Sequence, residues 1–338
     1  MTISKLILRN FRGVIEGEVD LAPLTILVGP NNSGKTTILE ALLLTHGSQN
    51  LPYGLLPYSV LSIIHETLSS NGLEHLVYSY GTITSRAMIG YLHDTTLSAT
   101  VIDITERLVK IHLLDIVNTL SEDAITNIVK GKTPEAFTPR FKCDLRLNPK
   151  PFIAKVLFIR NGIIKHVYNY MRRRWIELVG KGITRSTAKW VSKCLGEEYI
   201  DITAEPFGGD TEALYLYRAD GLRIRLGDLG DGIQLLISAK IMYEYSRPNL
   251  LLWDDIESHM NPRTLLLLGE WISQLVEDNV QVVLTTHSYE ALRTIASLAP
   301  EGKAKIVKLR LENGKLKTRY YSLSEVEELK DLGVDVRA

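Results

Sequence analysis

The segment GPNNSGKT, residues 29–36, is the feature that most restricts how this chain can fold. It fits the pattern G-x-x-x-x-G-K-[ST], in which backbone N–H groups surround phosphate oxygens, the lysine adds positive charge and the hydroxyl binds Mg²⁺. The run LTILVG before it predicts a buried strand, and ILEALLL after it predicts a helix to about Ser48. A helix that begins at such a turn also favours bound phosphate through its N-terminus. We therefore expect the nucleotide-binding residues to be Gly29, Asn31, Asn32, Ser33, Gly34, Lys35, Thr36 and Thr37.

The segment LLLWDDIESHMNP, residues 250–262, ends an apolar run on two aspartates and a glutamate. A charge directly after four apolar residues is costly unless it is paired or bound to metal, so we expect Asp254 to bind Mg²⁺ together with Thr36. Asp255 would then face the outer phosphate and orient a water molecule. Glu257 is expected to cap a helix or to contact a partner. The alternative, that all three acids only cap the following helix, is weakest for Asp254.

A second apolar strand, VQVVLTTH, ends on His287, whose imidazole would reach the terminal phosphate and the water. The alternative is a histidine with a structural role. Two hairpins are predicted, one through Asp220 and Gly221 and one through Asn313 and Gly314. Helices are predicted for IQLLISAKIMYEY and for residues 262–278, and the first 28 residues should form short strands with a turn at Glu16 and Gly17. The pattern between residues 50 and 199 is less clear: residues 60–104 fit strands or helices, and residues 163–194 fit one or two helices.

Composition restricts the class of protein rather than its chemistry. Lys plus Arg and Asp plus Glu each number 39 in 338 residues, so no overall positive field attracts nucleic acid. The local basic cluster MRRRW, residues 171–175, fits a solvated helix face better than a binding patch. No segment has the length of apolar sequence that spans a membrane, and we expect a cytoplasmic protein. Cys143 and Cys194 lack metal-ligand spacing and are expected to be buried thiols.

Taken in order, GPNNSGKTT, LGDLGDGIQLL, LLLWDDIESHMNP and VVLTTHS resemble the ABC-type ATPases of the RecF, structural-maintenance-of-chromosomes (SMC) and OLD group. The chain is most similar there to compact AAA-family, OLD-like ATPases without a Toprim nuclease domain. This resemblance implies an α/β P-loop NTPase fold of the ABC type, with a mixed central sheet flanked by helices, an antiparallel β subdomain and a largely helical insertion. We expect a discontinuous ATPase core from residues 1–50 and 205–338, and a partly helical inserted lobe from residues 51–204.

The resemblance also implies roles for individual residues. By this resemblance, Asp254 occupies the position of the Walker B metal ligand and Asp255 that of the catalytic glutamate. His287 occupies the position of the switch histidine. The signature that completes the site from a second subunit corresponds to Gly230, Asp231 and Gly232. ATP and Mg²⁺ are the implied cofactors, and ATP binding would join two copies into a homodimer.

Three departures from the family pattern affect these expectations. Asp255 is one methylene shorter than the usual glutamate, which favours slow hydrolysis. Gly230 replaces a serine that would contact the terminal phosphate, and Asp231 beside it is expected to be the N-cap of the next helix. No glutamine occurs between Gln49 and Gln234, so the family's glutamine loop has no assigned position.

The function we expect is Mg²⁺-dependent ATP binding and hydrolysis by a dimer that drives or gates a DNA or protein partner, in DNA repair or in defence against mobile elements. The alternative is an ATP-locked dimer that hydrolyses slowly or not at all. A nuclease is less favoured, because only 51 residues follow His287. The absence of an N-K-x-D motif disfavours a GTPase.

Overall fold

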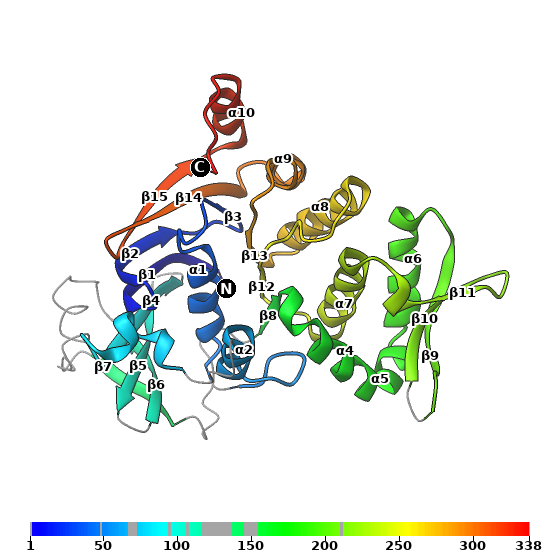
Figure 1. The fold of residues 1–338 in the computed structure, drawn as a ribbon, viewed down its shortest axis with the longest axis horizontal. Coiled ribbons are helices and arrows are strands. Elements are labelled where there is room, and N and C mark those ends of the chain that lie inside the picture. The colour runs from blue at the N-terminus through cyan, green and yellow to red at the C-terminus, as the bar shows by residue number, and fades with distance from the viewer. Residues whose placement is uncertain are drawn as a thin grey trace.

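The computed structural model describes residues 2–47, 49–66, 73–93, 96–105, 108–116, 137–144, 155–209 and 212–337. Most strands join one twelve-stranded mixed sheet in the order β7-β6-β5-β4-β1-β2-β15-β14-β3-β13-β12-β8 (Figure 1). Its strands are β1 Ile3–Phe11, β2 Val14–Asp20, β3 Leu24–Val28, β4 Arg86–His93, β5 Thr96–Thr105, β6 Leu108–Ile116, β7 Phe137–Asp144, β8 Val156–Ile159, β12 Leu250–Trp253, β13 Gln281–Thr285, β14 Ala304–Glu312 and β15 Lys315–Tyr321. A separate three-stranded sheet contains β9 Tyr199–Pro206, β10 Glu212–Arg218 and β11 Arg223–Arg225.

Five neighbouring strands, β14, β3, β13, β12 and β8, run parallel. Every residue of β3, β13, β12 and β8 is buried. Strands buried on both faces need helices on both sides, which explains why these runs are continuously apolar rather than alternating. Parallel strands also end at one edge, so the residues that follow β3, β13, β12 and β8 meet there.

The helices lie on both faces of this parallel region and extend beyond its β8 edge (Figure 1). The three-stranded sheet lies on the far side of α6 from the main sheet, and α10 stands apart near the end of the chain. The helices are α1 Lys35–Leu44, α2 Pro57–His65, α4 Ile164–Arg173, α5 Trp175–Gly180, α6 Ile183–Leu195, α7 Asp231–Ser246, α8 Pro262–Glu277, α9 Tyr289–Leu298 and α10 Leu323–Asp331.

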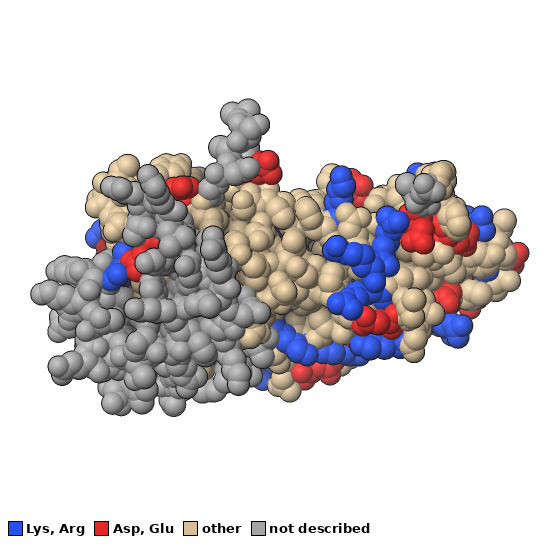
Figure 2. Space-filling model, turned by 90° about the horizontal axis from the view of Figure 1, so that it is seen from below, with Lys and Arg blue, Asp and Glu red and all other residues tan. Residues whose placement is uncertain are grey.

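Charge is distributed unevenly over the surface despite the neutral total. Figure 2 shows Lys and Arg side chains gathered, with acidic ones between them, in the half of the lower face that holds α4 and α5. Arg173, Arg174 and Lys181 are exposed in this region, which includes the basic cluster seen in the sequence. Arg174 pairs with Glu177 at 2.8 Å, so part of this charge is neutralised locally.

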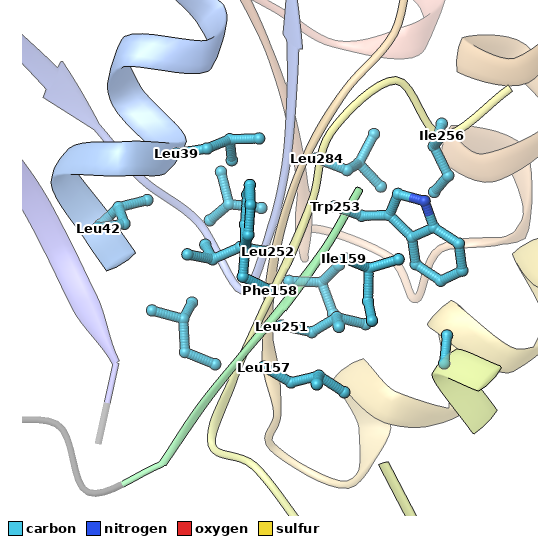
Figure 3. Packing of buried hydrophobic residues seen from close by; sticks show 14 of the residues in the cluster. Leu39, Leu42, Leu157, Phe158, Ile159, Leu251, Leu252, Trp253, Ile256 and Leu284 are labelled. Atoms are coloured by element: carbon cyan, nitrogen blue, oxygen red, sulfur yellow. The ribbon is translucent and has the colours of Figure 1, made fainter. Parts of the chain in front are cut away.

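The core between the sheet and its helices follows the pleat of the strands. In Figure 3, Phe158 and Leu252 lie on the side of α1 with Leu39 and Leu42, whereas Trp253 points to the opposite face. There its ring meets that of Trp271 from α8, with centroids 6.4 Å apart. Burial of this alternating set fixes the register of β8 against β12, because a slip of one residue would exchange the two faces.

Both predicted hairpins are confirmed. β10 and β11 pair antiparallel, and Gly221 in their turn has φ 87°. β14 and β15 pair through Asn313 and Gly314, whose φ angles of 50° and 77° are those of a turn that matches strand twist. The predicted strands before the glycine-rich turn, before Asp254 and before His287 are β3, β12 and β13.

The predicted turn at Glu16 and Gly17 is wrong. Phe11 pairs with Val14, so the chain turns at Arg12 and Gly13 and β2 continues through Gly17. Gly17 has a packing role instead: a Cβ there would lie 2.5 Å from Cβ of Leu316 on β15. The glycine that indicates a turn in the sequence therefore permits close contact between two strands.

The expected insertion contains strands as well as helices. Among the described residues between 51 and 204, β4 to β7 extend the main sheet by antiparallel pairing, and β8 pairs with β12. The boundaries near residues 50 and 205 stay a prediction. Cys194 is a buried thiol as expected, whereas the side chain of Cys143 lies outside the described residues. No helix in the described ranges is long and apolar enough to cross a membrane.

Candidate functional site

The glycine-rich loop after β3 is held in a conformation that requires glycine. Gly29 has φ 143°, and a Cβ there would lie 2.4 Å from the carbonyl oxygen of Leu309 on β14. The Lys35 ammonium donates to the carbonyl oxygens of Gly29 and Pro30 at 2.8 and 2.9 Å. The hydroxyl of Ser33 is buried without a hydrogen-bond partner among the described residues. The loop is therefore preformed and leaves polar groups unused.

A cavity of about 320 Å³ lies over this loop. Residues 31–37 line it, together with Asp255 and His287, whereas Gly29 of the predicted set is not among the described residues that line it. Three further residues that the sequence did not indicate also line it: Arg12, His65 and Arg160. Lysine, arginine and loop amide groups around one cavity make it suited to an anion such as a polyphosphate.

Asp254, at the end of β12, is almost completely buried and makes three polar contacts. Thr285 donates to its Oδ1 at 2.8 Å, Arg160 forms an ion pair with its Oδ2 at 3.1 Å, and Thr36 Oγ1 lies 3.4 Å from both oxygens. Mg²⁺ holds oxygen ligands at about 2.0–2.1 Å, so two oxygens bound side by side lie about 3 Å apart. Thr36 and Asp254 thus fit the predicted pair of metal ligands after a small adjustment.

Burial and neighbouring charges shift the pKa values of the site in opposite directions. Desolvation raises the pKa of Asp254, and the charge of Arg160 and the hydrogen bond from Thr285 oppose this rise. Desolvation lowers the pKa of Lys35, and the nearby carboxylates of Asp255, Asp254 and Glu257 oppose this fall. Neighbouring opposite charges therefore oppose the effect of burial on both Asp254 and Lys35.

Asp255 and His287 face each other at the mouth of the cavity, with Nε2 of the histidine 4.0 Å from Oδ1 of the aspartate. Their side chains are 49% and 42% exposed. Asp255 has φ 51°, a left-handed conformation that is unfavourable for a residue with a side chain. Its N–H donates to Thr285 Oγ1 at 2.8 Å, so the same threonine positions both aspartates.

The acids after β12 do not cap α8. Asn261 is its N-cap and accepts from the N–H of Thr264 at 2.9 Å. Glu257 instead accepts from the N–H of His287 at 2.6 Å, a role that neither predicted alternative included. Of the two aspartates, Asp255 lines the cavity, and Asp254 is buried beside Thr36, Thr285 and Arg160.

The backbone of His287 is held on both sides. Besides the contact of its N–H with Glu257, its carbonyl oxygen accepts from Arg337 at 2.8 Å. Asp335 fixes the guanidinium of Arg337 at 2.7 Å. The segment GVDVR, residues 333–337, thus contacts the loop that carries the histidine.

The three predicted signature residues differ in exposure. Gly230 and Asp231 are exposed at the start of α7, whereas Gly232 is buried, and a Cβ there would lie 2.4 Å from the carbonyl oxygen of His259. None of the three is among the described residues that line the cavity over the loop. The expectation that Asp231 is the N-cap is wrong: Gly230 holds that position and no side chain caps the helix.

Two residues that line the cavity are tied to the helix that follows the loop. Glu40 on α1 is fully buried and binds both the guanidinium of Arg12 and, at 2.6 Å, Nε2 of His65. A lone glutamate within the apolar run ILEALLL is the signal that could have indicated a buried ion pair. The partners themselves come from distant segments.

Comparisons with known proteins agree with this geometry. Residues 1–60 match the family described as an AAA ATPase domain, and residues 168–293 match the one described as an AAA domain, putative AbiEii toxin, Type IV TA system. Over 49 residues the chain is 49% identical to the DNA replication and repair protein RecF of Vibrio campbellii, and over 49 residues it is 45% identical to that of Aliivibrio fischeri. Each segment covers 14% of this chain and 14% of the relative.

Solved structures with a similar fold are SMC head domains. One, bound to the C-winged helix domain of ScpA, has a TM-score of 0.58 at 12% identity and covers 96% of this chain and 100% of its own. A second, bound to the C-terminal domain of ScpA derived from Pyrococcus furiosus, has a TM-score of 0.52 at 12% identity, with 98% of each chain covered. The SMC head domain from Thermotoga maritima gives 0.50 at 13% identity, with 95% and 99% covered.

The parallel sheet, the glycine-rich loop and the strand-end carboxylate form an SMC-head-like P-loop ATPase fold. Parts of the sequence match AAA ATPase families and RecF, which confirms the resemblance to RecF/SMC-type ATPases seen in the sequence.

The contact of Arg337 with His287 can be tested directly. Arg337→Ala should speed hydrogen exchange of the amides in residues 286–289 by about 3- to 10-fold, because one hydrogen bond contributes about 0.5–1.5 kcal/mol. Exchange measured by mass spectrometry checks this. Arg293→Ala, which removes an exposed arginine paired with Glu327, is the matched control and should leave these amides unchanged. Equal exchange in Arg337→Ala and the control would contradict the role of Arg337.

Proposed function

We propose that this chain binds ATP with Mg²⁺ over the glycine-rich loop, dimerises around the nucleotide and hydrolyses it to drive or gate a partner. The observation that carries the proposal is the position of Thr36 Oγ1, 3.4 Å from both carboxylate oxygens of Asp254. A hydroxyl and a buried carboxylate at this separation, beside Lys35, match the hard oxygen ligands that Mg²⁺ prefers.

Each residue of the cavity would have a distinct task. The backbone N–H groups of residues 31–36 and the Lys35 ammonium would bind phosphate oxygens. Thr36 and Asp254 would hold Mg²⁺, which when bound neutralises phosphate charge and polarises the terminal phosphorus. Asp255 would orient a water and accept its proton, and His287 would contact the same water and the outer phosphate.

Exposure supports the proposal that a second copy completes the site. Asp255 and His287 are only half-covered at the cavity mouth, and Gly230 and Asp231 are exposed on another part of the surface. If Gly230 and Asp231 of one copy covered Asp255 and His287 of another, the reacting groups would be shielded from bulk water. Excluding water strengthens every charge interaction in such a site.

We propose DNA as the partner and DNA repair or defence against mobile elements as the setting. The relatives in part of the sequence are described as DNA replication and repair proteins, and one matched family is described as a putative toxin of a toxin–antitoxin system. Arg173 at the end of α4 and its neighbour Arg174 are exposed and supply a local basic surface for phosphates. Figure 2 shows Lys and Arg side chains gathered in this part of the molecule.

A second candidate function is an ATP-locked dimer that hydrolyses slowly or not at all. Asp255 favours it, because the carboxylate is short, half-exposed and 4.0 Å from His287. Displacing a water-orienting group by about 1 Å can lower the rate of hydrolysis by about 100-fold. Binding and dimerisation would be unaffected by this displacement.

Removing the ammonium of Lys35 tests nucleotide binding. Lys35→Ala should weaken binding of Mg·ATP by about 10- to 100-fold, the effect of losing a charged hydrogen-bond donor. Calorimetric titration measures affinity, and sedimentation shows whether ATP still produces a dimer. Wild-type protein that binds no ATP, or a variant that binds as well as wild type, would contradict the proposal.

Lengthening Asp255 distinguishes the enzyme from the clamp. If reach limits hydrolysis, Asp255→Glu should raise kcat by about 10-fold or more, and Asp255→Asn should remove turnover while nucleotide affinity stays within about 3-fold. Phosphate release under saturating ATP gives kcat. Fast wild-type turnover that glutamate does not improve excludes the clamp, whereas no turnover in either protein excludes the enzyme.

Reversing the basic surface tests DNA as the partner. Duplex DNA with a fluorescent label should bind in the presence of ATP and Mg²⁺, with affinity that falls as salt rises. The double variant Arg173→Glu and Arg174→Glu should weaken binding by about 10-fold or more because it replaces attraction by repulsion. Fluorescence anisotropy measures this, with Arg293→Glu as the control. No binding by wild type at low salt would exclude DNA.

A further inference from the structure

Arg160 is the first residue after β8 and lies beside Asp254 at the carboxyl edge of the sheet. Ile159 pairs with Trp253, and the N–H of Asp254 donates to the carbonyl oxygen of Ile159 at 3.0 Å. The register of two parallel strands therefore brings the arginine next to the predicted metal ligand. Its side chain also lines the cavity over the glycine-rich loop.

The two oxygens of Asp254 have different partners. Oδ1 accepts a hydrogen bond from Thr285 at 2.8 Å, whereas Oδ2 has the ion pair with Arg160 at 3.1 Å. Thr36 Oγ1 is equally far from both. Arg160 thus already pairs with the carboxylate that a metal ion shared with Thr36 would need.

The ion pair with Asp254 uses little of what Arg160 offers. Its Nη1 atom, which makes this ion pair, lies 3.1 Å from Oδ2 but without the geometry of a hydrogen bond. A guanidinium carries five N–H donors in a planar fork that matches two oxygens of a phosphate. A guanidinium held by one poorly aligned contact on the wall of an anion cavity can turn to a ligand that the cavity receives.

A metal ion and the guanidinium would compete for the negative charge of Asp254, so Mg²⁺ bound to this carboxylate would weaken its ion pair with Arg160. The cavity that Arg160 lines offers the guanidinium a replacement anion once a polyphosphate is present. Phosphate oxygens match the planar fork of a guanidinium. ADP has one phosphate fewer than ATP and would offer the cavity fewer acceptors.

We propose that Arg160 is a positioning residue with two alternative acceptors: Asp254 in the nucleotide-free protein and the terminal phosphate when ATP and Mg²⁺ are bound. This inference rests on the proposed nucleotide site and adds the means by which the site distinguishes ATP from ADP. It also makes Arg160 a competitor of the metal for Asp254 before nucleotide arrives.

Two binding measurements on the full chain test the proposal without any assay of turnover. In Arg160→Ala, Mn²⁺ alone, followed by electron paramagnetic resonance, should bind several-fold more tightly because its competitor is gone. Calorimetry should show affinity for Mg·ATPγS falling by about 10- to 100-fold, as expected for lost charged hydrogen bonds, and affinity for Mg·ADP changing less than about 3-fold.

Arg160→Lys is a second variant that keeps the test valid if the alanine variant does not fold. It keeps the positive charge beside Asp254, so Mn²⁺ should bind as in wild type, but it lacks the planar fork and should lose part of the preference for Mg·ATPγS. Arg293→Ala, on the surface of α9, is the control that should behave as wild type.

The outcomes separate this inference from the proposed function. If wild type binds nucleotide but Arg160→Ala keeps either the wild-type Mn²⁺ affinity or the wild-type ratio of ATPγS to ADP affinities, the role of Arg160 is overturned and the nucleotide site stands. If wild type binds neither nucleotide, the proposed function itself fails.

Discussion

The buried carboxylate of Asp254 is the group on which the rest of the site depends. An ionised side chain in the interior is costly unless charges and hydrogen bonds compensate it, and burial alone raises its pKa. Thr285 from β13, Thr36 from α1 and Arg160 after β8 provide this compensation from three directions. They can do so only because β3, β13, β12 and β8 run parallel and end at one edge. The charge of Asp254 is therefore compensated only when the strands pair in the correct register.

Much of this edge could be predicted from the sequence, because its signals are local. GPNNSGKT lies between a buried strand and a helix, and Asp254 directly follows four apolar residues, so their meeting follows from the rule that parallel strands end together. The same rule applies to His287. Element boundaries agree within a few residues where apolar runs are continuous, as in β12 and β13.

The residues that were missed depend on pairing between distant segments. The strand VLFI before Arg160 is four residues long and lies in a region where strand and helix patterns are indistinguishable, so nothing in the sequence shows that it pairs with β12. Arg337 contacts a backbone carbonyl, which leaves no pattern in side-chain types. Gly17 was misread because glycine serves turns and close strand contacts alike, and only the neighbour Leu316 decides between them.

The site divides into groups that are fixed and groups that are not. The glycine-rich loop, Thr36, Asp254 and the backbone of His287 are held by several contacts each. The side chains of Asp255 and His287, which would act on water, are half-exposed and separated by 4.0 Å. Preorganised groups bind, whereas catalysis requires that the reacting groups be positioned and shielded as well. One copy of the chain thus has the arrangement for holding a nucleotide, and the step to turnover depends on whatever covers Asp255 and His287. A surface that brought Gly230 and Asp231 of a second copy there would couple hydrolysis to assembly, because the same contact would close the dimer and complete the reacting geometry.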